Sequence, residues 1–276
     1  MVADLAISLI DPRDEHRRGG RLPRWLRGLP RALGPAVLLA AWAAVSGFGL
    51  MPASQLPSPL AVVQTGIDLC RSGVLPRHLS ASLYRVALGL AIGVAIGLSL
   101  AALAGLYRRG EHVIDSAMNV LRTLPVIALL PLLVMWVGIG EKTKIVLIVI
   151  GVAFPIYTNT FAAIRGVDAK LIEAGQMFGL NRLGLISRVI LPGSVAGFLV
   201  GLRWAVGTAW LMLIFAETIN TYRGLGYLMN QAQTIGQTKV LLVIVVIYGL
   251  LGFVGDALVR GLERLLLSWR RGFEGT

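Results

Sequence analysis

Apolar runs of 18 to 28 residues recur along this sequence. A helix needs about 20 mostly apolar residues to cross a membrane, and six segments meet or approach that length: residues 32–50, 86–106, 123–140, 145–164, 189–216 and 240–258. Only 14 % of the 276 residues are charged, against roughly 25 % in soluble domains. The pattern predicts an all-α polytopic membrane protein with six transmembrane helices. It excludes a disordered chain and, with one cysteine, a disulfide-held scaffold.

Basic residues outnumber acidic ones by 26 to 14, which gives a net charge of +12. Nucleic acid is not the expected partner, because no basic stripe carries interleaved aromatic residues. With the N-terminus inside, the segments on the inner side of the predicted spans hold 17 Lys and Arg residues and the outer segments hold 7. This bias predicts that both termini are cytoplasmic. A basic tail at 1–31 and a C-terminal tail at 261–276 would then flank a membrane domain at 32–260.

Two stretches between the predicted spans are long. Residues 51–85 include Leu56-Pro57-Ser58-Pro59, and we expect an outer loop with an interfacial helix there. Residues 165–188 are rich in acidic and basic side chains. They predict a long inner loop that faces water.

This inner loop carries a spaced motif. It reads Glu173-Ala174-Gly175, three residues, Gly179, nine residues, Val189, one residue, then Leu191-Pro192. The pattern resembles the EAA loop of binding-protein-dependent ABC importer permeases, with Gly175 in place of alanine and Val189 in place of isoleucine. The resemblance implies that residues 165–193 couple the membrane domain to a separate ATPase.

The chemistry of these residues suits a docking loop. Ala174 and Gly175 are small enough for close approach to a partner, and Gly179 can end a helix with a positive φ angle. Pro192 can begin the next helix, because a residue in the first turn needs no N–H donor. Glu173 either pairs with a basic group of the partner or is a solvated carboxylate.

The resemblance extends over nearly the whole chain after the basic tail. It rests on the stretches LPSPLAVV, RHLSASLYRVALG, LRTLPVIALLPLLVMWVGIGEKTKI, FPIYTNTFAAIRGVD and FAETINTYRGLGYLMNQA. These look like the nitrate, sulfonate, taurine and bicarbonate branch, and most like aliphatic-sulfonate permeases. The resemblance implies a type I ABC importer permease (MetI-like) fold in the bacterial inner membrane. The implied solute is a small anion, first an aliphatic sulfonate, with taurine, nitrate and pyrimidine precursors as alternatives.

The same resemblance implies partners. They are a second copy of the permease, two ATP-binding cassette subunits, and a periplasmic or lipid-anchored solute-binding protein, besides membrane lipid. ATP and Mg are expected in the cassette subunits, because this chain has no Gly-Lys pair of a phosphate-binding loop. The chain is therefore predicted not to be an enzyme and to hold no cofactor.

Metal and catalytic sites are not predicted either. The three histidines are scattered without the spacing of metal ligands, and Cys70 has no companion cysteine. An ion-coupled secondary transporter is the rival from another class. Such a protein would show internal repeats or acidic relays within its spans, and the sequence shows neither.

Three ionisable residues are candidates for the translocation path. Arg203 lies inside the fifth predicted span, where it either faces a path for an anion or forms a structural pair. Arg122 begins the third span, and snorkelling to lipid phosphate explains it equally well. Glu217 ends the fifth span on the outer side, where an outer gate or a contact with the binding protein is expected.

Small residues recur at every fourth position of the second span. They predict one helix face that another helix approaches closely, either as plain packing or as an interface with a moving helix: Gly89, Gly93, Gly97, Ala101 and Gly105. Prolines predict kinks in the third and fourth spans: Pro125, Pro131 and Pro155. Asp256 and Arg260 are four residues apart, which favours a local ion pair.

Overall fold

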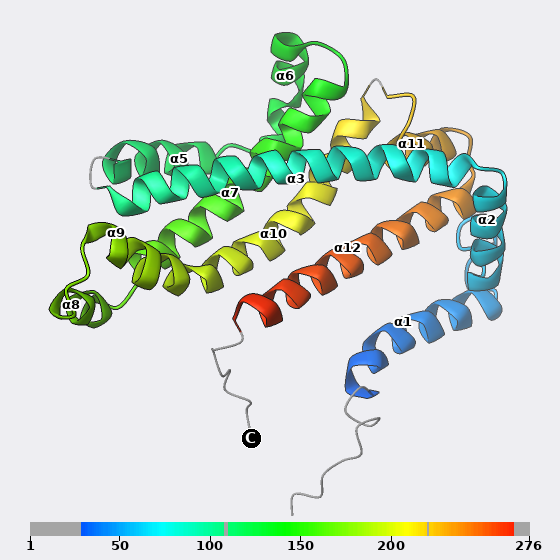
Figure 1. Ribbon diagram of the computed structural model, residues 1–276. Helices are drawn as coiled ribbons and strands as arrows, with labels where there is room; N and C mark the ends of the chain where they lie inside the picture. The colour runs from blue at the N-terminus through cyan, green and yellow to red at the C-terminus, as the bar shows by residue number, and fades with distance from the viewer. Residues whose placement is uncertain (1–28, 108–109, 220, 268–276) are drawn as a thin grey trace, which may run out of the picture. The chain divides into compact units, whose positions relative to one another are not determined.

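The computed structural model describes residues 29–107, 110–219 and 221–267 (Figure 1). Every regular element in these ranges is a helix. The chain forms two units, Met1–Pro59 and Leu60–Thr276. The predicted basic tail at 1–31 lies almost entirely outside the described residues, and so does most of the predicted C-terminal tail at 261–276.

The first unit contains helix α1 (Leu29–Gly47) and the turn that follows it. Trp42 Nε1 donates a hydrogen bond of 3.0 Å to the carbonyl oxygen of Pro57 and ties this turn to the helix. The described apolar part of α1 is Ala36–Gly47, which is shorter than the roughly 20 residues of a full span. The first predicted span is therefore present as a helix, but the described apolar part of this helix is too short to count as a membrane-spanning helix by length.

The second unit combines long and short helices. The long helices are α3 (Val74–Leu106), α7 (Glu141–Arg165), α10 (Leu191–Thr218) and α12 (Thr238–Leu266). The short ones are α2 (Pro59–Arg71), α5 (Ser116–Arg122), α6 (Leu130–Val137), α8 (Ala169–Met177), α9 (Arg182–Leu185) and α11 (Leu225–Thr234). Two π-helical turns, η2 (Glu111–Asp115) and η4 (Ile186–Ile190), and one 3-10 turn, η3 (Val126–Leu129), complete the order.

Four helices of the described chain are long and apolar enough to cross a membrane. They are Val74–Leu106, Glu141–Arg165, the continuous run Arg182–Thr218 and Thr238–Leu266. A fifth crossing is reached if the bent pair Glu111–Arg122 and Val126–Val137 counts as one broken span. The six predicted spans thus appear as four long helices, one bent pair and the shorter α1.

The third predicted span, 123–140, is helical only over Val126–Val137. This segment meets the preceding helical segment, Glu111–Arg122, at 90°. Pro125 stands at the break in an extended conformation, with ψ of 106°. A proline disfavours helical geometry in the residue before it and offers no N–H for a helical hydrogen bond. Pro131 lies in the first turn of α6, where that N–H is not needed.

The second predicted span starts earlier than expected. Helix α3 begins at Val74, so residues 74–85 belong to the long helix and not to the outer loop predicted at 51–85. Polar residues lower the hydropathy of this segment, so it does not look like part of a membrane span. Several of them are nevertheless buried: His78, Ser82 and Arg85. The short helix expected in the outer loop corresponds to α2.

Helix α7 forms the centre of the second unit. Its residues Leu147, Ile148, Val152 and Ile156 are fully buried in a core that also includes side chains of α3, α6 and α10. Pro155 lies inside α7, which continues on both sides of it. This packing places the two ends of α7 at the two regions described next.

Candidate functional site

The predicted coupling loop folds into a capped helix, α8. The Asp168 side chain caps its N-terminus by accepting a 2.9 Å hydrogen bond from the Lys170 amide. At its other end Gly179 has φ of 78°, the left-handed conformation that glycine adopts without strain. The Gly179 amide donates to Gln176 at 2.9 Å and the Leu180 amide to Gly175 at 3.0 Å. These two bonds form a Schellman cap, which ends the helix at a fixed place.

A second cap follows directly. The Asn181 side chain accepts a 2.8 Å hydrogen bond from the Gly184 amide and starts α9. The helix then runs through the π-helical turn η4 into α10, where Pro192 occupies the first turn. Leu191 begins α10 and is half exposed. The motif therefore spans two short helices and the root of a long one.

Gly175 has a different role from the one expected. It is buried, and a Cβ atom there would lie 2.7 Å from Leu185 Cδ2 and 3.3 Å from Leu180 Cδ1. The small residue thus allows α8 to pack on α9 of the same loop, and it does not face outward toward a partner. Ala174, beside it, is partly exposed.

The outer surface of the loop combines one carboxylate with apolar side chains. Glu173 is exposed. Large apolar side chains around it stand in the open: Leu171 is 57 % exposed, Met177 89 %, Phe178 88 % and Leu183 75 %. Exposed apolar patches of this kind mark sites where another protein or a membrane binds. We call this surface, formed by Leu171, Glu173, Met177, Phe178 and Leu183, the loop surface.

Arg203 forms ion pairs within the chain. Its Nε lies 3.3 Å from Asp256 and its Nη2 2.7 Å from Glu263, so it links α10 to α12. Asp256 also pairs with Arg260, as the four-residue spacing predicts. Of the two interpretations of Arg203, the geometry favours the structural pair.

The other two path candidates lie in contrasting surroundings. Arg122 ends α5 and is exposed, just before the break at Pro125. Glu217 is 1 % exposed, and its carboxylate is held inside the protein rather than on an open surface. The structure does not bring Arg122, Arg203 and Glu217 together.

Glu217 belongs to an ionic cluster that the sequence reasoning missed, in which Ser82, Arg85 and Glu217 are buried and Glu141 is exposed. Its Oε1 lies 2.5 Å from Arg85 Nη1 and accepts a 2.8 Å hydrogen bond from the Ser82 hydroxyl, while its Oε2 accepts one of 2.7 Å from the Gly226 amide. Arg85 also donates from Nε and Nη2 to Glu141, at 2.6 and 2.7 Å. We call this group of Ser82, Arg85, Glu141, Glu217 and the Gly226 amide the Arg85 cluster.

The Arg85 cluster joins three long helices at the end of the unit opposite the coupling loop. Arg85 comes from α3, Glu141 from the start of α7 and Glu217 from the end of α10. Gly224 has φ of 140° and lies so close to the Glu217 carboxylate that a Cβ atom would overlap it. Its amide donates a 3.0 Å hydrogen bond to His78 Nδ1. His78, Ser82 and Arg85 recur at helical spacing, which is the signal that could have indicated one polar face.

The glycines of α3 lie on this same face, further along the helix. A Cβ atom at Gly89 or Gly93 would lie 2.6 Å from Ile148 or Val152 of α7, and one at Gly97 would lie 2.8 Å from the carbonyl oxygen of Ala153. Helices α3 and α7 are therefore in backbone-level contact. Within the described residues no group of three or more His, Cys, Asp or Glu side chains is placed to hold a metal ion.

Comparison with known proteins places the chain in a family. The model of the family "binding-protein-dependent transport system inner membrane component" matches residues 93–268. The chain belongs to this family. A putative aliphatic sulfonates transport permease of Bacillus subtilis is 41 % identical over 91 % of this chain and 90 % of its own length. The corresponding putative permease of Escherichia coli is 40 % identical over 91 % and 95 %.

A further sequence relative and a solved structure agree with this family and with the fold. The taurine transport system permease of Escherichia coli is 33 % identical over 85 % of this chain and 87 % of its own. A solved chain from the MetNI methionine ABC transporter, in inward-facing conformations, matches with a TM-score of 0.55 at 23 % identity, covering 69 % of this chain and 97 % of that one. The protein is thus a multi-pass membrane protein, the permease of an ABC importer with a MetI-like fold.

Proposed function

We propose that this permease, paired with a second copy of itself, forms the path by which aliphatic sulfonates are imported. The proposal is carried by the two relatives named for aliphatic sulfonate transport, which are 41 % and 40 % identical over 91 % of the chain. The relative named for taurine, itself a sulfonate, is less similar at 33 %.

We further propose that the loop surface receives an ATP-binding cassette subunit. Its support is the combination of exposed apolar side chains, an exposed carboxylate at Glu173, and two helix caps that fix α8 and α9 on each other. A rigid loop of this kind can transmit a movement of the partner into α10, because η4 joins them without a flexible linker. ATP and Mg would be bound by the cassette subunits, and this chain would hydrolyse none.

The orientation is part of the same proposal. Both termini and the loop surface would face the cytoplasm, and a solute-binding protein would dock at the opposite end, near the Arg85 cluster. The support is the excess of Lys and Arg on the predicted inner segments, 17 against 7.

The coupling role is tested by comparing substitutions of two exposed carboxylates, one on the loop surface and one elsewhere. Glu173→Ala removes the acid of the loop surface, whereas Asp68→Ala removes an exposed acid on α2, away from the loop. We expect the Glu173 variant to reach the membrane in normal amounts, to lose the co-purifying ATPase and to lose sulfonate uptake, with the Asp68 variant unchanged. Normal uptake and normal co-purification with Glu173→Ala would refute the coupling role.

The solute is tested by uptake in cells that lack their own sulfonate importers. The chain is expressed with its partner subunits, and uptake of radiolabelled ethanesulfonate is measured in competition with taurine and nitrate. We expect ethanesulfonate to be the preferred solute. Preference for taurine would indicate a taurine importer instead of an aliphatic-sulfonate importer. Preference for nitrate would reject sulfonates as the solute.

A further inference from the structure

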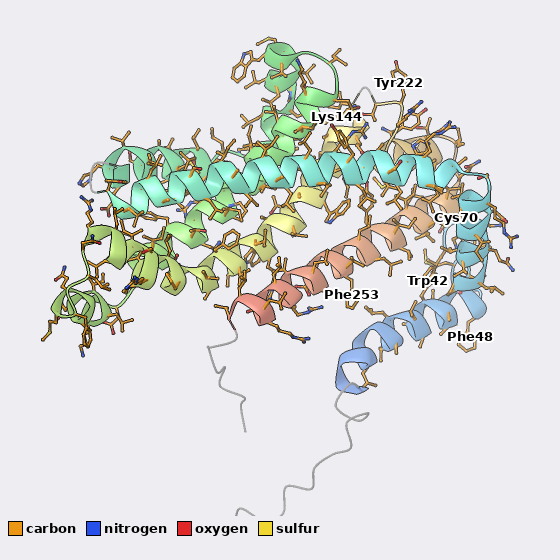
Figure 2. All side chains as sticks on the ribbon, in the orientation of Figure 1. Trp42, Phe48, Cys70, Lys144, Tyr222 and Phe253 are labelled. Carbon is orange, nitrogen blue, oxygen red and sulfur yellow. The ribbon has the colours of Figure 1, made fainter. Side chains whose placement is uncertain are left out.

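A cavity of about 520 Å³ opens beside the Arg85 cluster. Pockets that hold small molecules have volumes of roughly 300–1,000 Å³. The walls come from α3, from the start of α7 and from the turn after α10, and Lys144 and Tyr222 are labelled there in Figure 2. Its lining includes three cations, Arg85, Lys144 and Arg223, and one carboxylate, Glu141.

The charges of this cavity are not balanced. The Glu141 carboxylate accepts hydrogen bonds from Nε and Nη2 of Arg85 at 2.6 and 2.7 Å, and Lys144 Nζ reaches it only at 3.2 Å. Lys144 is 5 % exposed and bonds the Glu141 carboxylate, while Arg85 is shared between Glu141 and the buried Glu217. Counting Glu217, these three cations therefore face two carboxylates, and the positive charge left over is that of the exposed Arg223. An anion in the cavity would compensate this remaining charge.

The end of α7 adds a second, independent attraction. Helix α7 is 25 residues long, and its first residues, Glu141 and the preceding Gly140, line the cavity. Its N-cap residue, Gly140, has no side chain to cap the helix, and the acidic residue of the first turn, Glu141, is bound by Arg85. The unpaired N–H groups and the helix dipole at such an end favour an anion. The exposed Arg223, on the other wall, adds a planar donor group suited to oxyanions.

The cavity also has apolar walls. Tyr84 and Tyr222 line it and are 63 % and 86 % exposed, so their rings are free to cover a bound molecule. A small organic sulfonate has three acceptor oxygens at one end and an alkyl body at the other. Donors from Lys144, Arg223 and the start of α7 match the first part, and the tyrosine rings match the second.

We propose that this cavity is a receiving site for the sulfonate group of the solute, occupied before the solute crosses the membrane. The proposal rests on the sulfonate importer function proposed above and names residues of the permease that bind the solute directly. The two cations that contribute most are Lys144 and Arg223, because Arg85 is already committed to Glu141 and Glu217. Lys144 and Arg223 set the preference for an anion.

Binding is measured on the full chain in phosphatidylcholine nanodiscs by ¹⁹F NMR line broadening. The probe is 2,2,2-trifluoroethanesulfonate, and the neutral 2,2,2-trifluoroethanol is the ligand control. Lys144→Met and Arg223→Gln each remove one cation of the cavity. Lys142→Met is the matched control, because Lys142 is exposed, lies on the same first turn of α7 and does not line the cavity. Arg223 is exposed, so its substitution leaves the core intact.

We expect broadening of the sulfonate signal and none of the alcohol signal. Lys144→Met and Arg223→Gln each weaken binding about tenfold or more, since each removes a charge-assisted bond, while Lys142→Met binds as the unmodified chain does. Equal binding by all three variants would overturn the proposal. So would loss of the broadening of the sulfonate signal when phosphatidylglycerol is added to the nanodiscs, because a lipid headgroup would then be the occupant.

Uptake assays on the same variants separate this proposal from the proposed function. Sulfonate uptake by the unmodified transporter without binding in the cavity keeps the function and rejects the receiving site. Lys144-dependent binding without sulfonate uptake keeps the anion site and rejects the solute. Loss of uptake in Lys144→Met with unchanged sulfonate binding also rejects the site, because Lys144 would then act on transport without binding the solute.

Discussion

Arg85 and Glu217 are 3 % and 1 % exposed, and they compensate each other. Removing two charges from water costs several kcal/mol per ion, and the cost is offset only where the geometry is close and the remaining donors and acceptors are paired. Here the Ser82 hydroxyl, the Gly226 amide and the Glu141 carboxylate provide those partners. The Arg85 cluster therefore fixes the positions of its helices by making every separation of them unfavourable.

Substitution of Glu217 tests this interpretation. Glu217→Ala leaves the Arg85 guanidinium buried with Glu141 alone, and we expect it to lower the free energy of unfolding by about 3 kcal/mol. Glu263→Ala is the matched control, because its pair with Arg203 is 42–45 % exposed and such pairs contribute about 1 kcal/mol or less. Chemical denaturation of the purified chain in detergent measures both. Equal losses from the two variants would contradict a special role of the cluster.

Helix ends were easier to predict from the sequence than contacts between residues far apart in the chain. A glycine separated by three residues from Glu-Ala-Gly and a Leu-Pro pair indicated where helices end and begin, and the structure has Gly179 at φ of 78° and Pro192 in the first turn of α10. These features depend on neighbours along the chain. The pair of Arg85 and Glu217 joins residues 132 positions apart, and nothing in a single sequence states which distant charges meet.

Among the elements, α3 and α7 pack closely through the glycines of α3. At Gly97 a Cβ atom would lie 2.8 Å from the carbonyl oxygen of Ala153, and a backbone atom cannot rotate away. We expect Gly97→Ala to cost about 1–3 kcal/mol of stability through overpacking. Gly249→Ala, in α12, meets no atom within 4 Å and should leave stability nearly unchanged. Denaturation midpoints of the two variants decide the matter, and a stable Gly97→Ala would argue against close packing.

Helix α8 depends on its C-terminal cap. Gly179 has positive φ but open space around it, so the conformation and not the volume limits what can replace it. Asparagine tolerates this left-handed conformation, whereas a β-branched residue is strained by about 1–2 kcal/mol. We expect Gly179→Asn to keep most sulfonate uptake and Gly179→Val to lose it, with similar amounts of both in the membrane. If both variants transported alike, the cap would have no part in coupling.

Element boundaries were predicted well where apolar periodicity was uninterrupted and poorly elsewhere. The fourth span, predicted at 145–164, lies within α7. The third was expected as one span at 123–140, although Pro125 and Pro131 were both recognised there as sources of kinks. Composition indicated that the segment is apolar, but the helical run there covers only Val126–Val137 and meets the preceding segment Glu111–Arg122 at 90°, an arrangement that depends on how α6 packs on α7. Only the folded arrangement supplies that information.

At the scale of the whole molecule, the single cysteine reports the orientation. Cys70 lies on α2 and is exposed (Figure 2). If both termini are cytoplasmic, a membrane-impermeant maleimide should label Cys70 on intact cells whose outer membrane has been opened. In a Cys70→Ser background, a cysteine introduced at the exposed Ser187 should react only after the inner membrane is broken. The reverse pattern would invert the proposed topology.

The central helix α7 connects the two regions that the proposals concern. Its first residue, Glu141, is held in the Arg85 cluster, and its last, Arg165, leads into the coupling loop. At 1.5 Å per residue, α7 is a lever arm of about 37 Å with its fulcrum at the cluster. A tilt of about 5° around that fulcrum displaces the loop by about 3 Å. A small rotation of α7 about the cluster therefore corresponds to a larger displacement of the loop, where an ATPase would apply its force.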